Sequence, residues 1–274
     1  MKETIAIQGA EGSNHHKVAR DFYGNDIQLK ECMSFDVLVD SLLDKTANLG
    51  VMALENTIAG SIIPNYALID NNNLHIIGEE YLNIHHHLMC LGNQTIEDIK
   101  EVWSHPMALL QCKEFFKKHP HIKLVEDVDT AEVAKRISKE NLKGIAAIAP
   151  KIAAEIFDLA IIEDEIQTIK DNSTRFVIVQ TNEPAINEEV NKASLKFQLN
   201  HKRGSLAAIL NVLSDCKMNL TKIQSLPVIE MPWKYSFFVD VTFEEYKEYE
   251  KAKAIIEIMA EEFKILGTYK NGRK

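Results

Sequence analysis

The strongest constraint on the fold is a regular alternation of short apolar runs and helix-like stretches through the first 180 residues. The apolar runs predict strands over residues 4–8, 50–55, 74–78, 84–91, 144–149 and 175–180. Strands that alternate with helices predict largely parallel sheets with helices packed on them, which is an α/β fold. Ligands of such sheets bind at the carboxyl ends of the strands, where loops lead into helices.

Helix start signals stand between these runs. Ser13 and Ser34 each precede a helical pattern, and Asp129 is followed three residues later by a glutamate, as in a capping pair. Pro150 fits the first turn of another helix. These signals place helix N-termini directly after several of the predicted strands.

The last third of the chain has a different pattern. Residues 182–193 hold a proline, three asparagines and three glutamates, which predicts a linker between a first domain over 1–181 and a second over 194–274. The second domain has the order strand, helix, strand, strand, helix, strand, over residues 194–200, 204–216, 218–227, 235–242, 246–262 and 263–269. That βαββαβ order is typical of a ferredoxin-like unit.

Composition excludes several classes of partner. The 31 Lys and Arg residues are outnumbered by 40 Asp and Glu residues, so the net charge is −9 and no nucleic-acid or membrane partner is expected. No apolar stretch approaches the roughly 18 residues needed to span a bilayer, and the N-terminal sequence does not resemble a signal peptide. The four cysteines are widely separated, which indicates reduced, buried thiols in a cytoplasmic protein.

The first segment that could carry chemistry is Gly9-Ala10-Glu11-Gly12-Ser13, directly after the opening strand. Two glycines allow a tight turn, and the free N–H groups of the helix capped by Ser13 could receive an anion. The alternative is an ordinary strand–turn–helix connection. The third glycine of a dinucleotide fingerprint is missing, so nicotinamide binding is not expected.

A second segment, Glu55-Asn56-Thr57-Ile58-Ala59-Gly60-Ser61, follows an apolar strand. The Asn56 and Thr57 side chains could hydrogen-bond a hydroxyl or carboxylate of a ligand. The alternative is that these two side chains only cap the turn that follows.

A third segment begins at Ser104, which we predict to be a helix N-cap, with Pro106 in the first turn. Leu109, Cys112 and Phe116 are predicted to form the buried stripe of that helix. His105, beside the positive end of the helix, is either a hydrogen-bond donor to a substrate or a satisfied loop histidine.

A fourth segment, Asp171-Asn172-Ser173-Thr174-Arg175-Phe176, opens an apolar strand. Thr174 and Arg175 would point to opposite faces inside a strand, so both can serve one site only where the strand begins or at a bulge. Arg175 is suited to hold a carboxylate in a bidentate manner; the alternative is a surface arginine beside a core strand.

The run His85-His86-His87 could suggest a metal site. On a strand His85 and His87 would share one face, but no further ligand pattern accompanies them. We therefore predict no metal site and a solvated or hydrogen-bonded strand face.

Taken in order, these segments resemble prephenate dehydratase with a C-terminal ACT regulatory domain, over nearly the whole chain. The family's glycine motif is matched by Gly9, Gly12 and Ser13, with Ala10 in place of proline and His16 at a position where histidine is common. Its E-N-S/T-x-x-G motif is matched by Glu55, Asn56, Thr57 and Gly60. Its S-H-P-Q-A-L-x-Q-C motif is matched by Ser104, His105, Pro106, Ala108, Leu109, Gln111 and Cys112, with Met107 in place of the first glutamine. A small S/T-T-A motif is met in part by Thr130 and Ala131, and N-x-T-R-F is matched by Asn172, Thr174, Arg175 and Phe176.

The resemblance implies a bilobal catalytic domain like that of periplasmic binding proteins. It also implies decarboxylating dehydration of prephenate to phenylpyruvate, carbon dioxide and water in phenylalanine biosynthesis, without a cofactor. The implied catalytic residues are Thr174, His105 and Arg175, with the Thr174 hydroxyl assisting the departing hydroxide. The implied substrate-binding residues are Gly12, Ser13, Asn56, Thr57, Ser104, Gln111, Thr130, Asn172 and Phe176.

In the second domain the resemblance implies an effector site for L-phenylalanine. Its glycine motif appears as Gly204, Ser205, Leu206 and Ala207, and its E-S-R-P motif as Gln224, Ser225, Leu226 and Pro227. The family's glutamate and arginine are both replaced, and losing a charge-assisted hydrogen bond costs about 1.5–3 kcal/mol. A domain of this type also implies a homodimer or homotetramer.

Two other functions compete with this one. The motifs do not separate prephenate from arogenate, which carries an amino group in place of the keto group. The altered Ala10, Met107 and regulatory motifs also leave open a non-catalytic small-molecule binding or sensor protein.

Overall fold

The computed structural model describes residues 3–273 except 186, 188, 201, 229, 230, 232 and 233. The chain folds into two units, Met1–Ser61 with Tyr81–Phe176 and Ile62–Glu80 with Val177–Lys274. Strands β5 (His75–Asn83) and β11 (Ser173–Gln180) run from one unit into the other. Two positions of the predicted linker, Ile186 and Glu188, lie outside the described residues.

The first sheet combines apolar central strands with more polar strands at its two edges. It contains β1 (Thr4–Gln8), β2 (Gln28–Cys32), β3 (Leu49–Asn56) and the short β4 (Gly60–Ser61), and its order is β2-β1-β3-β11-β5 with β4 paired to β3. Strand β1 is parallel to both β2 and β3. Helices α1 (Asn14–Tyr23) and α2 (Phe35–Leu43) begin after Ser13 and Ser34, whose side chains accept backbone N–H groups as predicted.

The second sheet is mixed, which corrects the expectation of largely parallel strands. Its order is β10-β6-β9-β7-β8, and β6 is antiparallel to both of its neighbours. The strands are β6 (His87–Cys90), β7 (Glu101–Ser104), β8 (Lys123–Glu126), β9 (Ile145–Ala149) and β10 (Ala160–Glu163). The predicted strand over 84–91 was therefore too long, because residues 84–86 do not pair with a neighbouring strand. Instead, the backbone N–H of Ile84 donates to Asn172 O and that of His86 donates to Gln167 Oε1.

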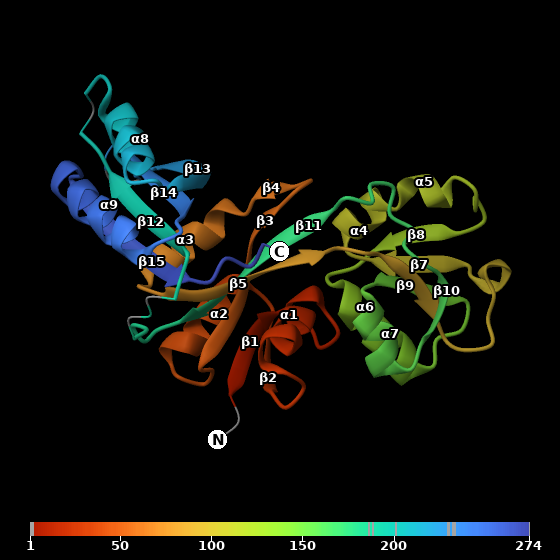
Figure 1. Ribbon diagram of the computed structural model, residues 1–274. Helices are drawn as coiled ribbons and strands as arrows, with labels where there is room; N and C mark the ends of the chain where they lie inside the picture. The colour runs from red at the N-terminus through yellow and green to blue at the C-terminus, as the bar shows by residue number, and fades with distance from the viewer. Residues whose placement is uncertain are drawn as a thin grey trace. The chain divides into compact units, whose positions relative to one another are not determined.

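Helices cover both faces of this second sheet (Figure 1). Leu88 and Ile148 face a core that is completed by α4 (Pro106–Gln111) and α5 (Lys113–Phe116). The short helix η1 (Ile96–Asp98) precedes β7 in the chain. Met89 and Ala147, one residue away on the same strands, face a core completed by α6 (Thr130–Glu140) and α7 (Lys151–Phe157). Side chains alternate along a strand, so these short runs are apolar on both faces.

The third sheet belongs to the second unit and has the predicted order of elements. It is formed by β12 (Lys192–Gln198), β13 (Asn219–Pro227), β14 (Tyr235–Thr242) and β15 (Glu262–Tyr269), with helices α8 (Ser205–Asp215) and α9 (Tyr246–Met259). The sheet order β13-β14-β12-β15, with antiparallel neighbours throughout, is that of a split βαβ unit. Ala193, Leu195 and Phe197 of β12 pack in the core shared with α8 and α9.

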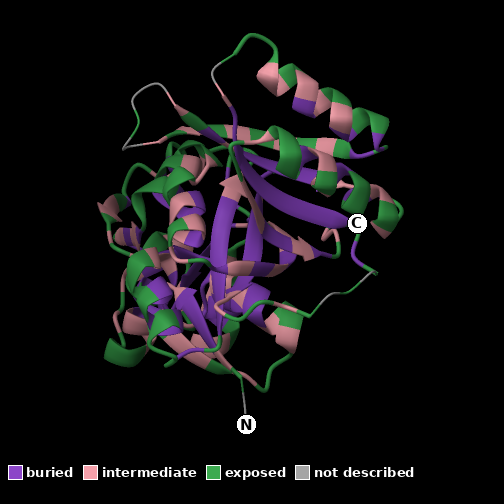
Figure 2. Cartoon of the chain, turned by 90° about the vertical axis from the view of Figure 1, so that its left-hand side faces the viewer, coloured by how far each residue is buried: buried purple, intermediate pink, exposed green. Residues whose placement is uncertain are grey.

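The opposite face of β12 is polar but equally buried. Figure 2 colours buried residues purple, and long purple stretches run along the strands. Lys192 donates to both carboxylate oxygens of Glu79 at 2.8 Å, and Lys196 pairs with Asp70 at 2.7 Å. Asp70 and Glu79 come from residues 62–80, which contain α3 (Ile63–Asn71). These ion pairs join residues 62–80 to the sheet of the same unit.

None of the helices in the described part of the chain is both long and apolar enough to cross a membrane.

Candidate active site

The site begins at the carboxyl end of β3, where Asn56 uses both ends of its side-chain amide. Its Oδ1 accepts the backbone N–H groups of Ile58 and Ala59 at 2.9 and 2.8 Å, which fixes the turn. Its Nδ2 donates to Asn172 Oδ1 at 2.7 Å and to Thr174 Oγ1 at 2.9 Å. Asn56 therefore caps the turn, as the second interpretation of its motif predicted, and its amide nitrogen also reaches Asn172 and the predicted catalytic residue Thr174.

Thr174 is the second residue of β11 and is buried. Because its Oγ1 accepts a hydrogen from Asn56, the hydroxyl keeps its own hydrogen for another acceptor. Backbone bonds hold the two segments together, since Thr57 N donates to Ser173 O and Ser173 N donates to Thr57 Oγ1, both at 2.9 Å. The geometry makes Thr174 a polarised hydrogen-bond donor.

Gln111, the last residue of α4, extends this network. Its Oε1 accepts from Asn172 Nδ2 at 3.3 Å and lies 2.8 Å from His86 Nε2. The chain of contacts from His86 through Gln111, Asn172 and Asn56 to Thr174 is continuous. Four predicted site residues, Asn56, Gln111, Asn172 and Thr174, are thus brought together within the first unit.

His86 belongs to this network although no motif singled it out. The bond to Gln111 requires a hydrogen on Nε2, so Nδ1 is an acceptor, and it is buried without a partner among the described residues. Burial lowers the pKa of His86, so its imidazole is neutral and donates from Nε2 to Gln111 Oε1. Its backbone N–H donates to the buried Gln167 at 2.9 Å. The run of three histidines was a signal, but the sequence did not show which one faced inward.

The other two histidines of that run bond to the segment before β11. His87 Nδ1 lies 3.0 Å from Asp164 Oδ1, and His85 Nδ1 lies 3.3 Å from Glu165 Oε1. Among the described residues no three His, Cys, Asp or Glu side chains are grouped so that they could hold a metal ion.

The glycine loop lies against two helices rather than in the network. Gly9 and Gly12 both have φ of 89°, and a Cβ on Gly12 would lie 3.1 Å from Ala153 Cα of α7. The Gly12 N–H donates to His16 Nδ1 at 3.0 Å, and burial lowers the pKa of His16 to about 4, which keeps that nitrogen an acceptor. Ser13 caps α1 through the His16 N–H.

Ser104 is not the N-cap that the sequence predicted. It ends β7, is fully buried, and its hydroxyl donates to Ile148 O of the neighbouring strand at 2.8 Å. His105 takes the capping position, where its Nδ1 accepts the Met107 N–H at 3.2 Å. Strand β7, which the sequence did not predict, ends at Ser104, so the cap falls one residue later than expected.

Arg175 and Phe176 are both buried in β11. Alternation along the strand puts Phe176 on the Thr174 face, where its ring meets the His15 ring at 5.0 Å in an edge-on arrangement. The same alternation directs Arg175 to the other face, so the two side chains diverge at the start of the strand.

Thr130 is the first residue of α6, beside the N-cap Asp129. Asp129 Oδ1 accepts the Ala131 and Glu132 N–H groups at 2.9 Å. Burial raises the pKa of Asp129 despite these bonds. A Cβ on Gly9 would lie 2.7 Å from Asp129 Oδ2, so the glycine loop approaches this helix end closely.

In the second unit, the two motifs implied for an effector lie at one helix start and on one strand. Gly204 is the N-cap of α8 with φ of 85°, and Ser205 donates to Asn200 Oδ1 at 2.8 Å. Leu206 packs against the core of the unit, whereas Ala207 is exposed. Residues Gln224 to Pro227 end β13, the edge strand, and pair with β14.

Comparisons with known proteins place this geometry in a family. The family model described as prephenate dehydratase matches residues 5–184. Arogenate dehydratase/prephenate dehydratase 2, chloroplastic, of Arabidopsis thaliana is 34% identical over 277 residues, which cover 97% of this chain and 72% of the relative. The bifunctional chorismate mutase/prephenate dehydratase of Buchnera aphidicola subsp. Acyrthosiphon pisum is 30% identical over 241 residues, 86% of this chain and 63% of the relative.

Solved structures agree on the fold. The prephenate dehydratase of Staphylococcus aureus superposes with a TM-score of 0.82 at 23% identity, covering 98% of this chain and 100% of that one. The prephenate dehydratase of Arthrobacter aurescens in complex with L-Phe superposes with a TM-score of 0.84 at 22% identity, covering 98% of this chain and 90% of that one. GqqA, described as a quorum quenching acylase, gives 0.85 at 24%, covering 98% of both chains, and at such identity the likeness concerns the fold alone. From the match over residues 5–184 and the 34% identity along almost the whole chain, this protein belongs to the prephenate dehydratase family.

Proposed function

We propose that this chain is a hydro-lyase that converts prephenate to phenylpyruvate, carbon dioxide and water in phenylalanine biosynthesis. The observation that carries the proposal is the hydrogen bond from Asn56 Nδ2 to Thr174 Oγ1, at 2.9 Å. It turns the threonine hydroxyl into a donor where two predicted motifs meet. The family match over residues 5–184 supports the same reaction.

The reaction needs little more than a placed donor. The bond from the ring to its carboxylate breaks and releases carbon dioxide, and the electron pair enters the ring, which becomes aromatic as it expels the hydroxide. Hydroxide is a poor leaving group, so a hydrogen-bond donor at this oxygen lowers the barrier. The oxygen takes up one proton and leaves as water, and solvent returns that proton to the donor. Thr174 is the donor, and Asn56 increases its acidity by donating to the same oxygen.

The rest of the network fixes that donor in place. Gln111 and Asn172 hold the Asn56 amide with its NH₂ toward Thr174, and His86 holds Gln111. The resemblance also assigns Arg175 to one carboxylate of the substrate. Because its side chain leaves β11 on the face opposite Thr174, this role requires the substrate to reach both faces at the start of the strand. His105, Ser13 and Gly12 line the approach in a two-lobed catalytic domain. Thr57, Ser104, Thr130 and Phe176 complete the set of substrate-binding residues.

Turnover of prephenate tests the proposal directly. We expect phenylpyruvate, measured as its enol absorbance in alkali. We also expect Thr174→Ala to lower kcat by about 10²–10³-fold, as loss of a donor to a developing oxyanion does. Thr174→Ser keeps the hydroxyl and serves as the matched control. A fully active Thr174→Ala variant would rule out the role given to this residue, and tight binding of prephenate without turnover would indicate a binding or sensor protein instead.

Arogenate is the second candidate substrate, because the Arabidopsis relative carries both activities in its name. The two compounds differ only at the side chain, where a keto group replaces an amino group. Comparing kcat/KM for the two at equal enzyme concentration decides between them. A ratio of at least ten in favour of arogenate would reassign the substrate.

We propose that residues 194–274, which are part of the second unit, act as an ACT regulatory domain, after a catalytic domain over 1–181 and a linker over 182–193. The split βαβ sheet and the L-Phe complex of the Arthrobacter neighbour support an amino-acid effector. Gln224 and Leu226 replace the charged residues of the effector motif, so inhibition by L-phenylalanine is weakened about ten- to a hundredfold. Titrating activity with L-phenylalanine measures this, and light scattering tests for the homodimer or homotetramer, which a monomeric mass would refute.

A further inference from the structure

The directions of the hydrogen bonds in the amide network follow from the turn after β3. Asn56 Oδ1 accepts two backbone N–H groups of this turn, so its Nδ2 must face the other side. That nitrogen donates to Asn172 Oδ1 at 2.7 Å, which leaves Asn172 Nδ2 to donate to Gln111 Oε1 at 3.3 Å. The side-chain oxygen of Gln111 therefore faces the network, and His86 has to donate to it from Nε2, at 2.8 Å.

This direction leaves the NH₂ group of Gln111 without a role inside the chain. Both contacts of its side chain, to His86 and to Asn172, are made by Oε1. Gln111 is half-buried at the end of α4, and no acceptor bonds its Nε2 among the described residues. An NH₂ group that is unbonded within the chain is available to a carboxylate or hydroxyl of a ligand.

The contact between His86 and Gln111 is held from both sides by one short segment. His86 is 6% exposed, and its backbone N–H donates to Gln167 Oε1 at 2.9 Å. The next residue, Thr168, donates its backbone N–H to Gln111 O at 2.9 Å. His86 Nδ1 is buried without a partner among the described residues, which costs stability. A buried group that costs stability and is held this firmly indicates a contribution to function.

We propose that His86 is a positioning residue for substrate binding, because its Nε2–H fixes the Gln111 amide with the NH₂ group toward a carboxylate of the substrate. Asn172 alone would hold that amide by one hydrogen bond of 3.3 Å, which is a weaker restraint. The Asn56 amide, by contrast, is fixed by the turn even without His86. His86 therefore acts on binding through Gln111 more than on the donor Thr174. The role toward the substrate rests on the function proposed above.

Steady-state kinetics with prephenate separates binding from the chemical step. His86→Leu removes the imidazole donor, so we expect KM to rise about tenfold, which corresponds to about 1.4 kcal/mol, while kcat changes by less than about threefold. His86→Gln places an amide N–H close to the position of Nε2 and should recover most of the lost affinity. A fall in kcat with KM unchanged, or no recovery with glutamine, would overturn the proposal.

A double-mutant cycle tests whether His86 acts through Gln111. Gln111→Ala removes the amide itself, so adding His86→Leu to that variant should not lower kcat/KM further. Additive losses would show that His86 acts by another route and would refute the proposal. His87→Leu is the matched control, because His87 is also 6% exposed but contacts Asp164 outside the network. We expect this variant to leave KM unchanged.

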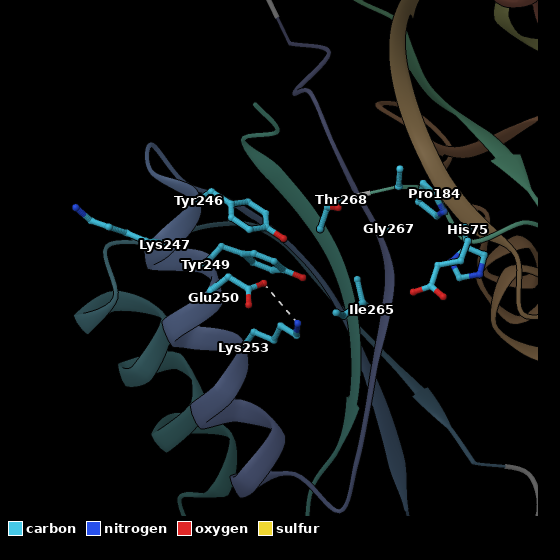
Figure 3. A pocket seen from close by; sticks show the side chains of 12 residues that line it. His75, Pro184, Tyr246, Lys247, Tyr249, Glu250, Lys253, Ile265, Gly267 and Thr268 are labelled. Carbon is cyan, nitrogen blue, oxygen red and sulfur yellow. Dashed lines mark hydrogen bonds and ion pairs between the residues drawn. The ribbon is translucent and has the colours of Figure 1, made fainter. Parts of the chain in front are cut away.

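A second control lies in the other unit, where α9 and β15 line a pocket of about 600 Å³. Figure 3 shows Tyr249 of α9 with its phenol group directed toward β15. The Tyr249 hydroxyl resembles His86 Nδ1 in being buried without a partner among the described residues. Tyr249→Phe should leave KM for prephenate unchanged. An equal rise of KM in this variant would mean that loss of any buried polar group weakens binding, and the proposal would fail.

A measurement without substrate tests the orientation itself. Long-range proton–nitrogen NMR spectra of the full chain report which ring nitrogen of a histidine carries the hydrogen, and the His86 signals are assigned by their loss in His86→Gln. We expect the neutral tautomer with its hydrogen on Nε2, and a hydrogen on Nδ1 would refute the proposal whatever the activity. If the unmodified chain shows the Nε2 tautomer but does not turn over prephenate, the proposed function fails while the orientation of Gln111 stands.

Discussion

Replacing Asn56 by aspartate tests the central hydrogen bond of the site with a change of one atom. The new carboxylate keeps an oxygen for the Ile58 and Ala59 N–H groups, so the turn survives. It removes the NH₂ group that donates to Asn172 and Thr174. Thr174 must then donate its own hydrogen to residue 56, and it is lost as a donor to the substrate.

The size of the effect follows from these contacts. The hydrogen bond of 2.7 Å to Asn172 is lost and the one to Thr174 is reversed, so the free energy of unfolding falls by about 1 kcal/mol. For a chain of this size that lowers Tm by about 2–4 °C. Loss of the donor at the departing oxygen lowers kcat by about 10²–10³-fold. Activity should therefore fall far more than stability.

The measurement is prephenate turnover at saturating substrate, with thermal unfolding followed by circular dichroism. Asn172→Asp is the matched control, because it places the same charge beside Asn56 and still accepts from Asn56 Nδ2. We expect Asn56→Asp to lose at least ten times more kcat than Asn172→Asp. If both variants lose activity equally, the charge accounts for the loss and the donor role of Thr174 is refuted.

Three further predictions concern stability. Lys192→Met removes the ammonium group that donates to both oxygens of the buried Glu79 carboxylate, so urea unfolding should show a loss of about 3–5 kcal/mol. Adding Glu79→Leu should restore most of that loss; no recovery would contradict the pairing. Gly12→Ala should destabilise more than Gly24→Ala, because both glycines have positive φ but only Gly12 has backbone 3.1 Å from the added Cβ; equal losses would contradict this packing. Burial lowers the pKa of His15 from 6.5 to about 4 in the folded protein, so as the pH falls the unfolded chain takes up this proton first. The free energy of unfolding should therefore fall between pH 6.5 and 4, by up to about 1.4 kcal/mol per pH unit. His15→Leu should flatten that slope when urea unfolding is measured at each pH, and an unchanged slope would refute the assignment to His15.

Local signals in the sequence predicted local structure well. Ser13 and Ser34 cap helices as predicted, because the serine oxygen accepts a backbone N–H group from the first turn of the helix that follows and needs no distant partner. Strands β1 and β3 were found because both of their faces are buried, which gives continuous apolar runs. By contrast β7 and β8 carry exposed or half-exposed polar residues in four-residue strands, which are too short for periodicity to separate from loops.

Long-range contacts set the limit of prediction. Motif matches named Asn56 and Thr174, but the hydrogen bond between them spans 118 positions, and its direction comes only from the fold. His86 contacts Gln111 and Gln167, which are 25 and 81 positions away, so the run of three histidines alone could not show which of them joins the network. The ion pair of Glu79 with Lys192 spans 113 positions, and it joins residues 62–80 to the second unit although they lie among residues that were predicted to form the first domain.

The position of β11 between β3 and β5 has a consequence for how the protein is made. Translation proceeds at about 5–20 residues per second, so Asn56 leaves the ribosome about 6–24 s before Thr174, which lies 118 residues later. Throughout that interval the nascent sheet has an open gap where β11 belongs, with the unpaired backbone of β3 available to other chains. Slow codons or truncation shortly before residue 173 should therefore favour aggregation of the newly synthesised chain.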